Sequence, residues 1–196
     1  MNGTAHASYS FLIFSIISTL IFGTIPTGGL AFLSLAAGIS PDIDGLYWAL
    51  KNKGKKMDNS FQHHLYYPTH WPVSYLPMVV WTVVCGFLDF YFIYFLAITV
   101  GIYSHLTFDS ISCGDGMNWG APWGRKFINL YSDKTDGYHG KYWAIRYRKT
   151  IFFKLENIAA ITSIILLILF ATQNPQSLAW YIVGIAGLVF LIITGF

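Results

Sequence analysis

Residues 90–109 read FYFIYFLAITVGIYSHLTFD, an apolar run that ends in a histidine and an aspartate. A transmembrane helix needs roughly 20 predominantly apolar residues, and the helix expected here, at about 90–108, is about that long. Five further apolar runs, at about 7–25, 27–40, 71–88, 153–172 and 177–196, predict with it a bundle of six helices. The run at 27–40 is short and contains glycine, so it is either a short span or a helix buried against its neighbours. We therefore expect an all-α, polytopic membrane bundle forming a single domain over residues 1–196.

Composition supports a membrane protein. Of the 196 residues, 55% are hydrophobic and only 11% are charged, whereas soluble domains carry about 25% charged residues. This excludes a water-soluble domain, and it excludes a disordered chain, which would need low hydrophobicity and high charge. The formal net charge of +3 also argues against a nucleic-acid partner, because such proteins present a dense basic surface. The environment we expect is the lipid bilayer.

The basic residues predict the orientation in the membrane. All 12 Lys and Arg residues fall in two segments, at 51–56 and 125–154. The connections near Gly23–Pro26, Leu88–Asp89 and Gln173–Gln176 carry none. With six helices, both basic segments lie on one side, which the positive-inside rule makes cytoplasmic. We therefore expect cytoplasmic loops at 45–70 and 110–150, cytoplasmic termini, and an integral protein of a prokaryotic inner membrane.

Histidines and aspartates gather at one end of the expected bundle. The start of the first helix, the end of the second, the start of the third and the end of the fourth all share the cytoplasmic side. Polar residues also occur at helix ends simply because water solvates them, but this set is large and includes no lysine, so we favour a metal site. The candidate metal ligands are His6, Asp42, Asp44, His63, His64, His70, His105 and Asp109.

Spacing and ligand type indicate the metal. His105 and Asp109 are four residues apart and so share one helix face. They can chelate one ion together, or the carboxylate can instead orient the imidazole. Mixed His and Asp ligands suit a divalent transition metal, with Zn preferred and Mn or Fe as alternatives. The supply of ligands is sufficient for two ions, and paired ions can stabilise both oxygens in the displacement of a phosphate ester.

The ordered motifs resemble a known family. Pro41-Asp42-x-Asp44, His64 with Thr69-His70, Ser104-His105-x-x-x-Asp109 and Trp119-Gly120-x-Pro122 resemble the membrane-bound metal-dependent hydrolases, which include LexA-regulated inner-membrane proteins of the YdjM type. The resemblance covers about residues 1–125 and implies a distant relation to zinc-dependent phospholipase C and P1-type nuclease, which are all-helical phosphodiesterases. Carried over by motif, the implied ligands are Asp42, Asp44, His64, His70, His105 and Asp109, with His6 matching a histidine near the family's N-terminus.

The sequence departs from the family pattern at two places. Leu65 follows His64 where the family often has arginine. The His-x-x-Thr-His block of the family is also longer in this sequence by a residue or more, so the choice between His63 and His64 stays open. The second His-x-x-x-Glu helix of the zinc phospholipases is missing, so a third ion would need His139 or Glu156 as a ligand.

These features lead to a functional hypothesis with two alternatives. We expect metal-assisted hydrolysis of a phosphate ester or diphosphate of a lipid or polyprenyl substrate, with Asp44 or Asp109 as general base. Basic residues that could bind the phosphate are Arg125, Lys126, Arg146 and Arg148. Their positions could also be explained by the positive-inside rule alone, without any role in binding. The alternatives are a non-catalytic scaffold linked to a stress response and a metal-ion transporter. The oligomeric state stays open.

Overall fold

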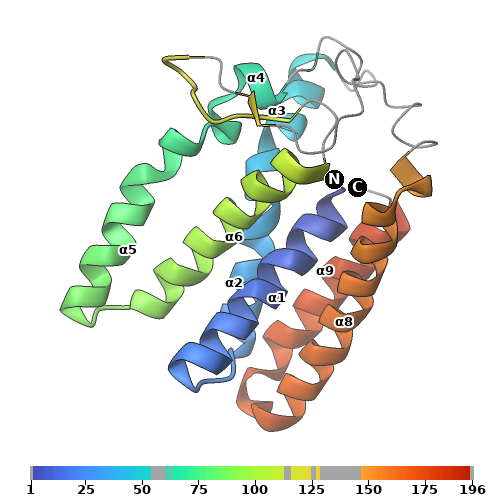
Figure 1. The fold of residues 1–196 in the computed structure, drawn as a ribbon. Coiled ribbons are helices and arrows are strands. Elements are labelled where there is room, and N and C mark those ends of the chain that lie inside the picture. Colours follow the sequence, from blue (N-terminus) through green and yellow to red (C-terminus); the bar gives the residue numbers. More distant parts are fainter. Residues whose placement is uncertain are drawn as a thin grey trace.

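The computed structural model describes residues 2–53, 61, 63–112, 116–124, 127–128 and 147–194. Six of its helices correspond to the six apolar runs and lie side by side (Figure 1). They are α1 (Gly3–Phe22), α2 (Gly28–Ile39), α5 (Leu76–Leu88), α6 (Phe92–Ser112), α8 (Ile151–Gln173) and α9 (Leu178–Thr194). The expected all-α membrane bundle is confirmed.

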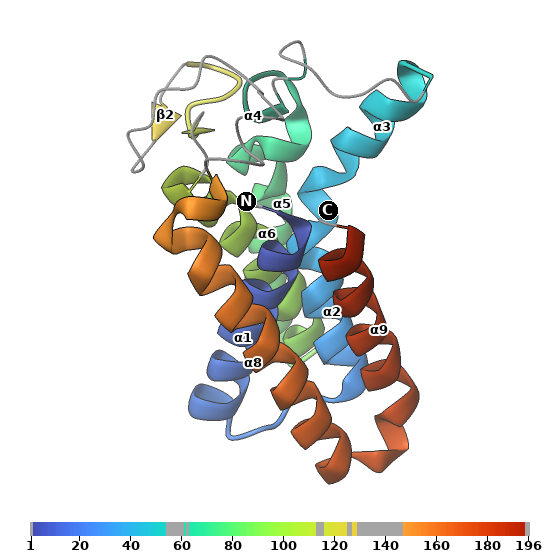
Figure 2. The same ribbon diagram turned by 90° about the vertical axis from the view of Figure 1, so that its right-hand side faces the viewer.

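Shorter elements join these helices. Most of one short helix and the whole of two others lie at 45–70, so this segment, which was expected as a loop, contains helical structure. The short elements are η1 (Ser40–Asp42), α3 (Ile43–Lys51), α4 (His63–Tyr66), η2 (Pro68–His70), η3 (Pro72–Tyr75), η4 (Tyr147–Lys149) and η5 (Pro175–Ser177). The strands β1 (Met117–Asn118) and β2 (Phe127–Ile128) pair antiparallel. The start of α1, the end of α9, α3 and α4 all lie at one end of the bundle (Figures 1 and 2), which we call the polar end.

Among the described residues, four helices are long and apolar enough to cross a membrane: α1, α6, α8 and the continuous segment Pro175–Thr194. The segment Pro72–Leu88 is apolar but shorter. With 12 residues, α2 is about 18 Å long at 1.5 Å per residue, well short of a hydrocarbon core of about 30 Å. It packs against α1, α6 and α9, so it is the buried helix that its glycine-containing sequence allows.

The helices enclose an apolar core and present an apolar surface. Phe11, Leu35, Leu167 and Leu188 are buried together, with Tyr181, whose hydroxyl donates to the Pro26 carbonyl at 2.6 Å. Large apolar side chains are also exposed along the outside of the long helices, for example on α1, α5 and α9. Lipid tails are as apolar as leucine, so this surface is suited to a bilayer.

Small residues bring α1, α2 and α6 close together at the polar end. A Cβ atom at Gly38 of α2 would lie 2.6 Å from the His6 carbonyl oxygen, and one at Gly101 of α6 would lie 2.6 Å from the Ala37 Cβ. Ser10 of α1 bonds to the Ser104 hydroxyl at 2.7 Å and donates to the Gly101 carbonyl at 3.1 Å. These contacts fix α2 against α1 and α6, which carry the first and last of the candidate metal ligands.

Candidate metal centre

Six of the eight candidate ligands lie in one cluster at the polar end, although they come from five different elements. His6 lies in the second turn of α1, whose first turn is capped by Asn2. Asp42 ends η1, His64 lies in α4, and His70 ends η2. His105 and Asp109 lie one turn apart near the end of α6. Their side chains are buried, except that the Asp42 side chain is 20% exposed.

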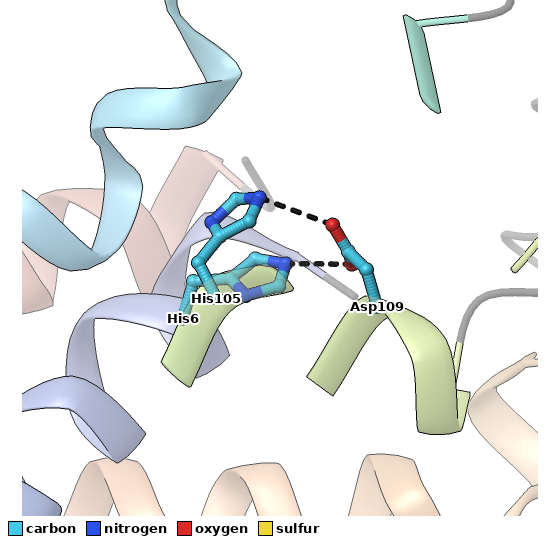
Figure 3. Close-up of side chains that lie close together, drawn as sticks. All are labelled: His6, His105 and Asp109. Atoms are coloured by element: carbon cyan, nitrogen blue, oxygen red, sulfur yellow. Dashed lines mark ion pairs between the residues drawn. The ribbon is translucent and has the colours of Figure 1, made fainter. Parts of the chain in front are cut away.

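Asp109 is at the centre of this cluster. Its Oδ1 atom lies 3.2 Å from Nε2 of His6, and its Oδ2 atom lies 3.1 Å from Nε2 of His105 (Figure 3). The same Oδ2 atom lies 3.3 Å from Nε2 of His64 and 3.8 Å from Nε2 of His70. One buried carboxylate therefore faces four imidazoles from four elements.

Asp42 lies beside two of these imidazoles. Its Oδ1 atom is 3.6 Å from Nε2 of His70 and 3.7 Å from Nε2 of His105, and those two nitrogens are 3.3 Å apart. Burial alone would raise the pKa of the Asp42 carboxyl, but the charges of the neighbouring His105 and His70 imidazoles hold that pKa well below its usual range. Asp42 is therefore an anionic candidate metal ligand at the edge of the cluster.

The outer ring nitrogens show how two imidazoles are oriented. Nδ1 of His105 lies 2.7 Å from the Gly38 carbonyl oxygen. A carbonyl can only accept a hydrogen bond, so Nδ1 of His105 donates to it, and Nε2 is the nitrogen of this ring that faces the cluster. Nδ1 of His70 lies 2.8 Å from Oδ2 of Asp44, which also accepts from the Thr69 hydroxyl at 2.9 Å. Such outer partners are typical of metal-binding histidines.

His70 also carries charge. Burial works against a charged imidazole, but the carboxylates of Asp42 and Asp44 raise the pKa of His70 to about 10. Of the two, Asp44 at 2.8 Å is within hydrogen-bond distance, whereas Asp42 at 3.6 Å is not. The positive charge of this imidazolium balances the carboxylates around it, because buried charges are stable only when they are paired or coordinate metals.

The donor atoms fit a divalent transition metal. They form three overlapping groups, each with its donor atoms within 4.8 Å of one another: His6, His105 and Asp109; Asp42, His70 and His105; His64, His70 and Asp109. A metal cation bound to Nε2 of His70 would replace the proton on that nitrogen, and its positive charge would balance the surrounding carboxylates in place of the imidazolium charge. The Nδ1 atom of His6 is buried and has no hydrogen-bond partner within the part of the chain that the structure describes.

Asp44 contacts Nδ1 of His70 at 2.8 Å, and its role as a metal ligand or general base stays a prediction. It was expected as a metal ligand and as a general base, together with Asp109. It belongs to none of the three donor groups, and it lies on the side of the His70 ring that faces away from Asp109. Of the neighbouring histidines His63 and His64, it is His64 whose Nε2 reaches Asp109, and the His63 side chain lies outside the described part of the structure.

The candidate substrate-binding cations are only partly described. Arg125, Lys126 and Arg146 lie outside the described residues, as does His139. Arg148 is exposed in η4. Glu156, considered for a third ion, is buried in α8 and accepts a hydrogen bond from the Tyr147 hydroxyl. It belongs to none of the donor groups found among the described residues.

Two residues that support the cluster were assigned no role from the sequence alone. Gly38 accepts the His105 hydrogen bond through its carbonyl, and the glycine within the short α2 run was the available signal. Thr69 holds the Asp44 carboxylate, and its place beside His70 in the sequence was the corresponding hint. The His70 segment is also fixed from neighbouring elements, since the hydroxyls of Tyr75 and Tyr103 donate to the carbonyls of Thr69 and Pro72 at 2.8 and 2.9 Å.

Comparison with known proteins matches the chain to a protein family. No curated protein and no solved structure matches the chain significantly. The sequence profile of the YdjM inner membrane protein family matches residues 1–194, which confirms the resemblance to proteins of the YdjM type. This match covers nearly the whole chain, so the protein belongs to the YdjM inner membrane protein family.

Proposed function

We propose that this membrane protein is a metal-dependent hydrolase that cleaves a phosphate ester or diphosphate of a lipid or polyprenyl substrate. The observation that carries the proposal is the position of Asp109, with one carboxylate oxygen 3.2 Å from Nε2 of His6 and the other 3.1 and 3.3 Å from those of His105 and His64. Buried clusters of imidazole and carboxylate donors are typical of transition-metal sites.

The donors are sufficient for two ions. Each imidazole offers one nitrogen to the cluster and so serves one ion, whereas a carboxylate has two oxygens and can bridge two. The groups His6, His105, Asp109 and His64, His70, Asp109 would each hold one ion, and Asp109 is common to both groups. Asp42 lies near His70 and His105 and is a second carboxylate able to bridge. Zinc is the preferred metal, with manganese or iron as alternatives.

A metal in this position would lower the pKa of a bound water and offset charge on the phosphate. The chain's own residues would orient the ligands: Asp44 holds Nδ1 of His70, and the Gly38 carbonyl holds Nδ1 of His105. With Asp44 behind His70, Asp109 and Asp42 are the carboxylates left to accept a proton within the cluster. Arg148, and the cations Arg125, Lys126 and Arg146, are candidates to bind the phosphate.

The proposed location is the cytoplasmic face of the membrane. Five basic residues lie in or beside the elements at the polar end: Lys51, Lys53, Arg148, Lys149 and Lys154. By the positive-inside rule, this end faces the cytoplasm. A site at that depth is suited to a substrate whose headgroup lies at the bilayer surface. A transporter site would instead lie near the midplane of the membrane.

The test combines metal content with hydrolysis. The protein purified without chelators should contain transition metal by elemental analysis and should hydrolyse a polyprenyl diphosphate or a phospholipid in detergent or nanodiscs. His105→Ala and Asp42→Asn should remove activity. The matched control is Asp89→Asn, the same chemical change at an exposed residue of the α5–α6 turn. Wild-type protein without bound metal, or full activity in His105→Ala, would overturn the proposal.

A further inference from the structure

The helix α3 has an apolar face that is largely exposed in the described part of the structure, although the Tyr47 ring lies beside the Tyr67 ring at 6.5 Å between centroids. Ile43, Leu46, Tyr47 and Leu50 are between 56% and 72% exposed. Their spacing of three and four residues places them on one side of the helix. The opposite side carries Asp44 and Trp48, which are buried, and the Trp48 ring contacts the Phe61 ring at 5.7 Å between centroids. The helix is therefore amphipathic, with the larger part of its apolar surface facing outward.

Basic residues border this apolar face. Lys51 ends α3, and its ammonium group lies 5.9 Å from the centre of the Tyr47 ring. Lys51 and Lys53 are exposed, and the sequence continues with Lys55 and Lys56. The only carboxylate within α3 is that of Asp44, which faces inward. An outward apolar face beside lysines, with an aromatic ring between them, is typical of helices that bind anionic membrane surfaces.

The position of α3 favours the bilayer over a protein partner. Only the three residues of η1 separate α3 from α2, which is packed among the long helices of the bundle. The helix extends outward at the polar end, beyond the end of α9 (Figure 2). At about 1.5 Å per residue its nine residues span about 13 Å, so its apolar face cannot lie far from the membrane surface.

We propose that α3 lies in the membrane–water interface, with Ile43, Leu46, Tyr47 and Leu50 among the lipid headgroups and upper acyl chains and its lysines paired with anionic headgroups. The helix α3 also connects the membrane interface to the metal-ligand cluster, because Asp44 on its inner face lies 2.8 Å from Nδ1 of His70. The lipid surface thus fixes the helix that positions one imidazole. This inference does not depend on the proposed hydrolysis, since it concerns the surface of α3 and not the reaction.

Spin labels test the proposal in nanodiscs that contain an anionic phospholipid. In a background with Cys85 and Cys113 replaced by serine, single cysteines replace Leu46 and Leu50 in separate proteins. Two controls frame them: Leu20→Cys, exposed on the spanning helix α1, and Lys53→Cys, exposed beyond α3. Power saturation measures the access of oxygen, which concentrates in lipid, and of a water-soluble nickel complex.

We expect labels at 46 and 50 to show an oxygen-to-nickel access ratio several-fold above that at 53 and closer to that at 20. Exchange of the anionic lipid for a zwitterionic one should lower this ratio, and Lys51→Gln with Lys53→Gln should remove that lipid dependence. A ratio equal to that at 53 would overturn the proposal. Low access to both reagents would overturn it as well, because it would mean that a protein surface covers α3.

Discussion

Asp44 and His70 form a pair in which Oδ2 of the carboxylate lies 2.8 Å from Nδ1 of the imidazole, while Nε2 of the same ring faces Asp42 and Asp109. The pair joins two elements, α3 and η2, and Thr69 adds a second hydrogen bond to the carboxylate. A ring held in this way has one orientation and one nitrogen available for a metal. Asp44 therefore acts on the cluster through His70.

Replacing Asp44 by asparagine tests this role. Asp44→Asn should weaken metal binding by about 10- to 100-fold, the usual effect of losing an outer partner, while the number of ions bound at saturation stays the same. Competition with a metal chelator measures the affinity, and elemental analysis measures the number. Asp89→Asn serves as the control with unchanged affinity. Loss of one ion at saturation would instead show that Asp44 is itself a ligand.

Replacing Asp109 should have the larger effect. Asp109→Asn removes the charge that faces His6, His64 and His105, so both proposed ions lose a ligand. We expect metal binding to weaken by about 100-fold or more, on the order of 3 kcal/mol, and the number of bound ions to fall. The same measurements on Asp42→Asn provide the comparison. Retention of all bound metal in Asp109→Asn would contradict a central role for this carboxylate.

The sequence predicted the bundle because its signals are local. Apolar runs of about 20 residues and turns without lysine identify the helices, and their alternating direction brings His6, His70 and His105 to one end. Glycine in the run at 27–40 also allowed α2 to be a buried helix. The helix α3 was missed because its nine residues are too few to form a spanning apolar run, and its outward apolar face suits a membrane interface and not a core.

The roles of individual ligands depend on contacts that no local pattern reveals. Asp42 and Asp44 were treated alike, but residues two apart on a helical segment do not face each other, and the chain is helical from Ser40 onward. Asp42 therefore faces the cluster while Asp44 reaches His70 from behind. The preference for His64 arises because α4 packs against η2 and β1 and places Nε2 of His64 3.3 Å from Asp109 of α6, which depends on residues far apart in the sequence.

Removing metal should destabilise the wild-type protein. A ligand that binds only the folded state stabilises it by about 2.7 kcal/mol at 100 times its dissociation constant, so treatment with a chelator should lower the melting temperature in detergent, and zinc should restore it. Thermal unfolding followed by tryptophan fluorescence measures the change. Asp109→Asn should melt at the same temperature with and without chelator. An unchanged wild-type melting temperature would mean that no metal stabilises the fold.

Two glycines of α2 test the close packing that supports His105. In Gly38→Ala the new Cβ would lie 2.6 Å from the His6 carbonyl oxygen, whereas at Gly29 a Cβ meets nothing within 4 Å. Gly38→Ala should therefore reduce stability by about 1–3 kcal/mol through overpacking, and it should weaken metal binding, since the Gly38 carbonyl orients His105. Gly29→Ala should leave metal binding unchanged and alter stability by about 1 kcal/mol or less, in the stabilising direction. Chemical unfolding and chelator competition on both variants measure these effects, and equal behaviour of the two would show that α1 and α2 are not held at this contact.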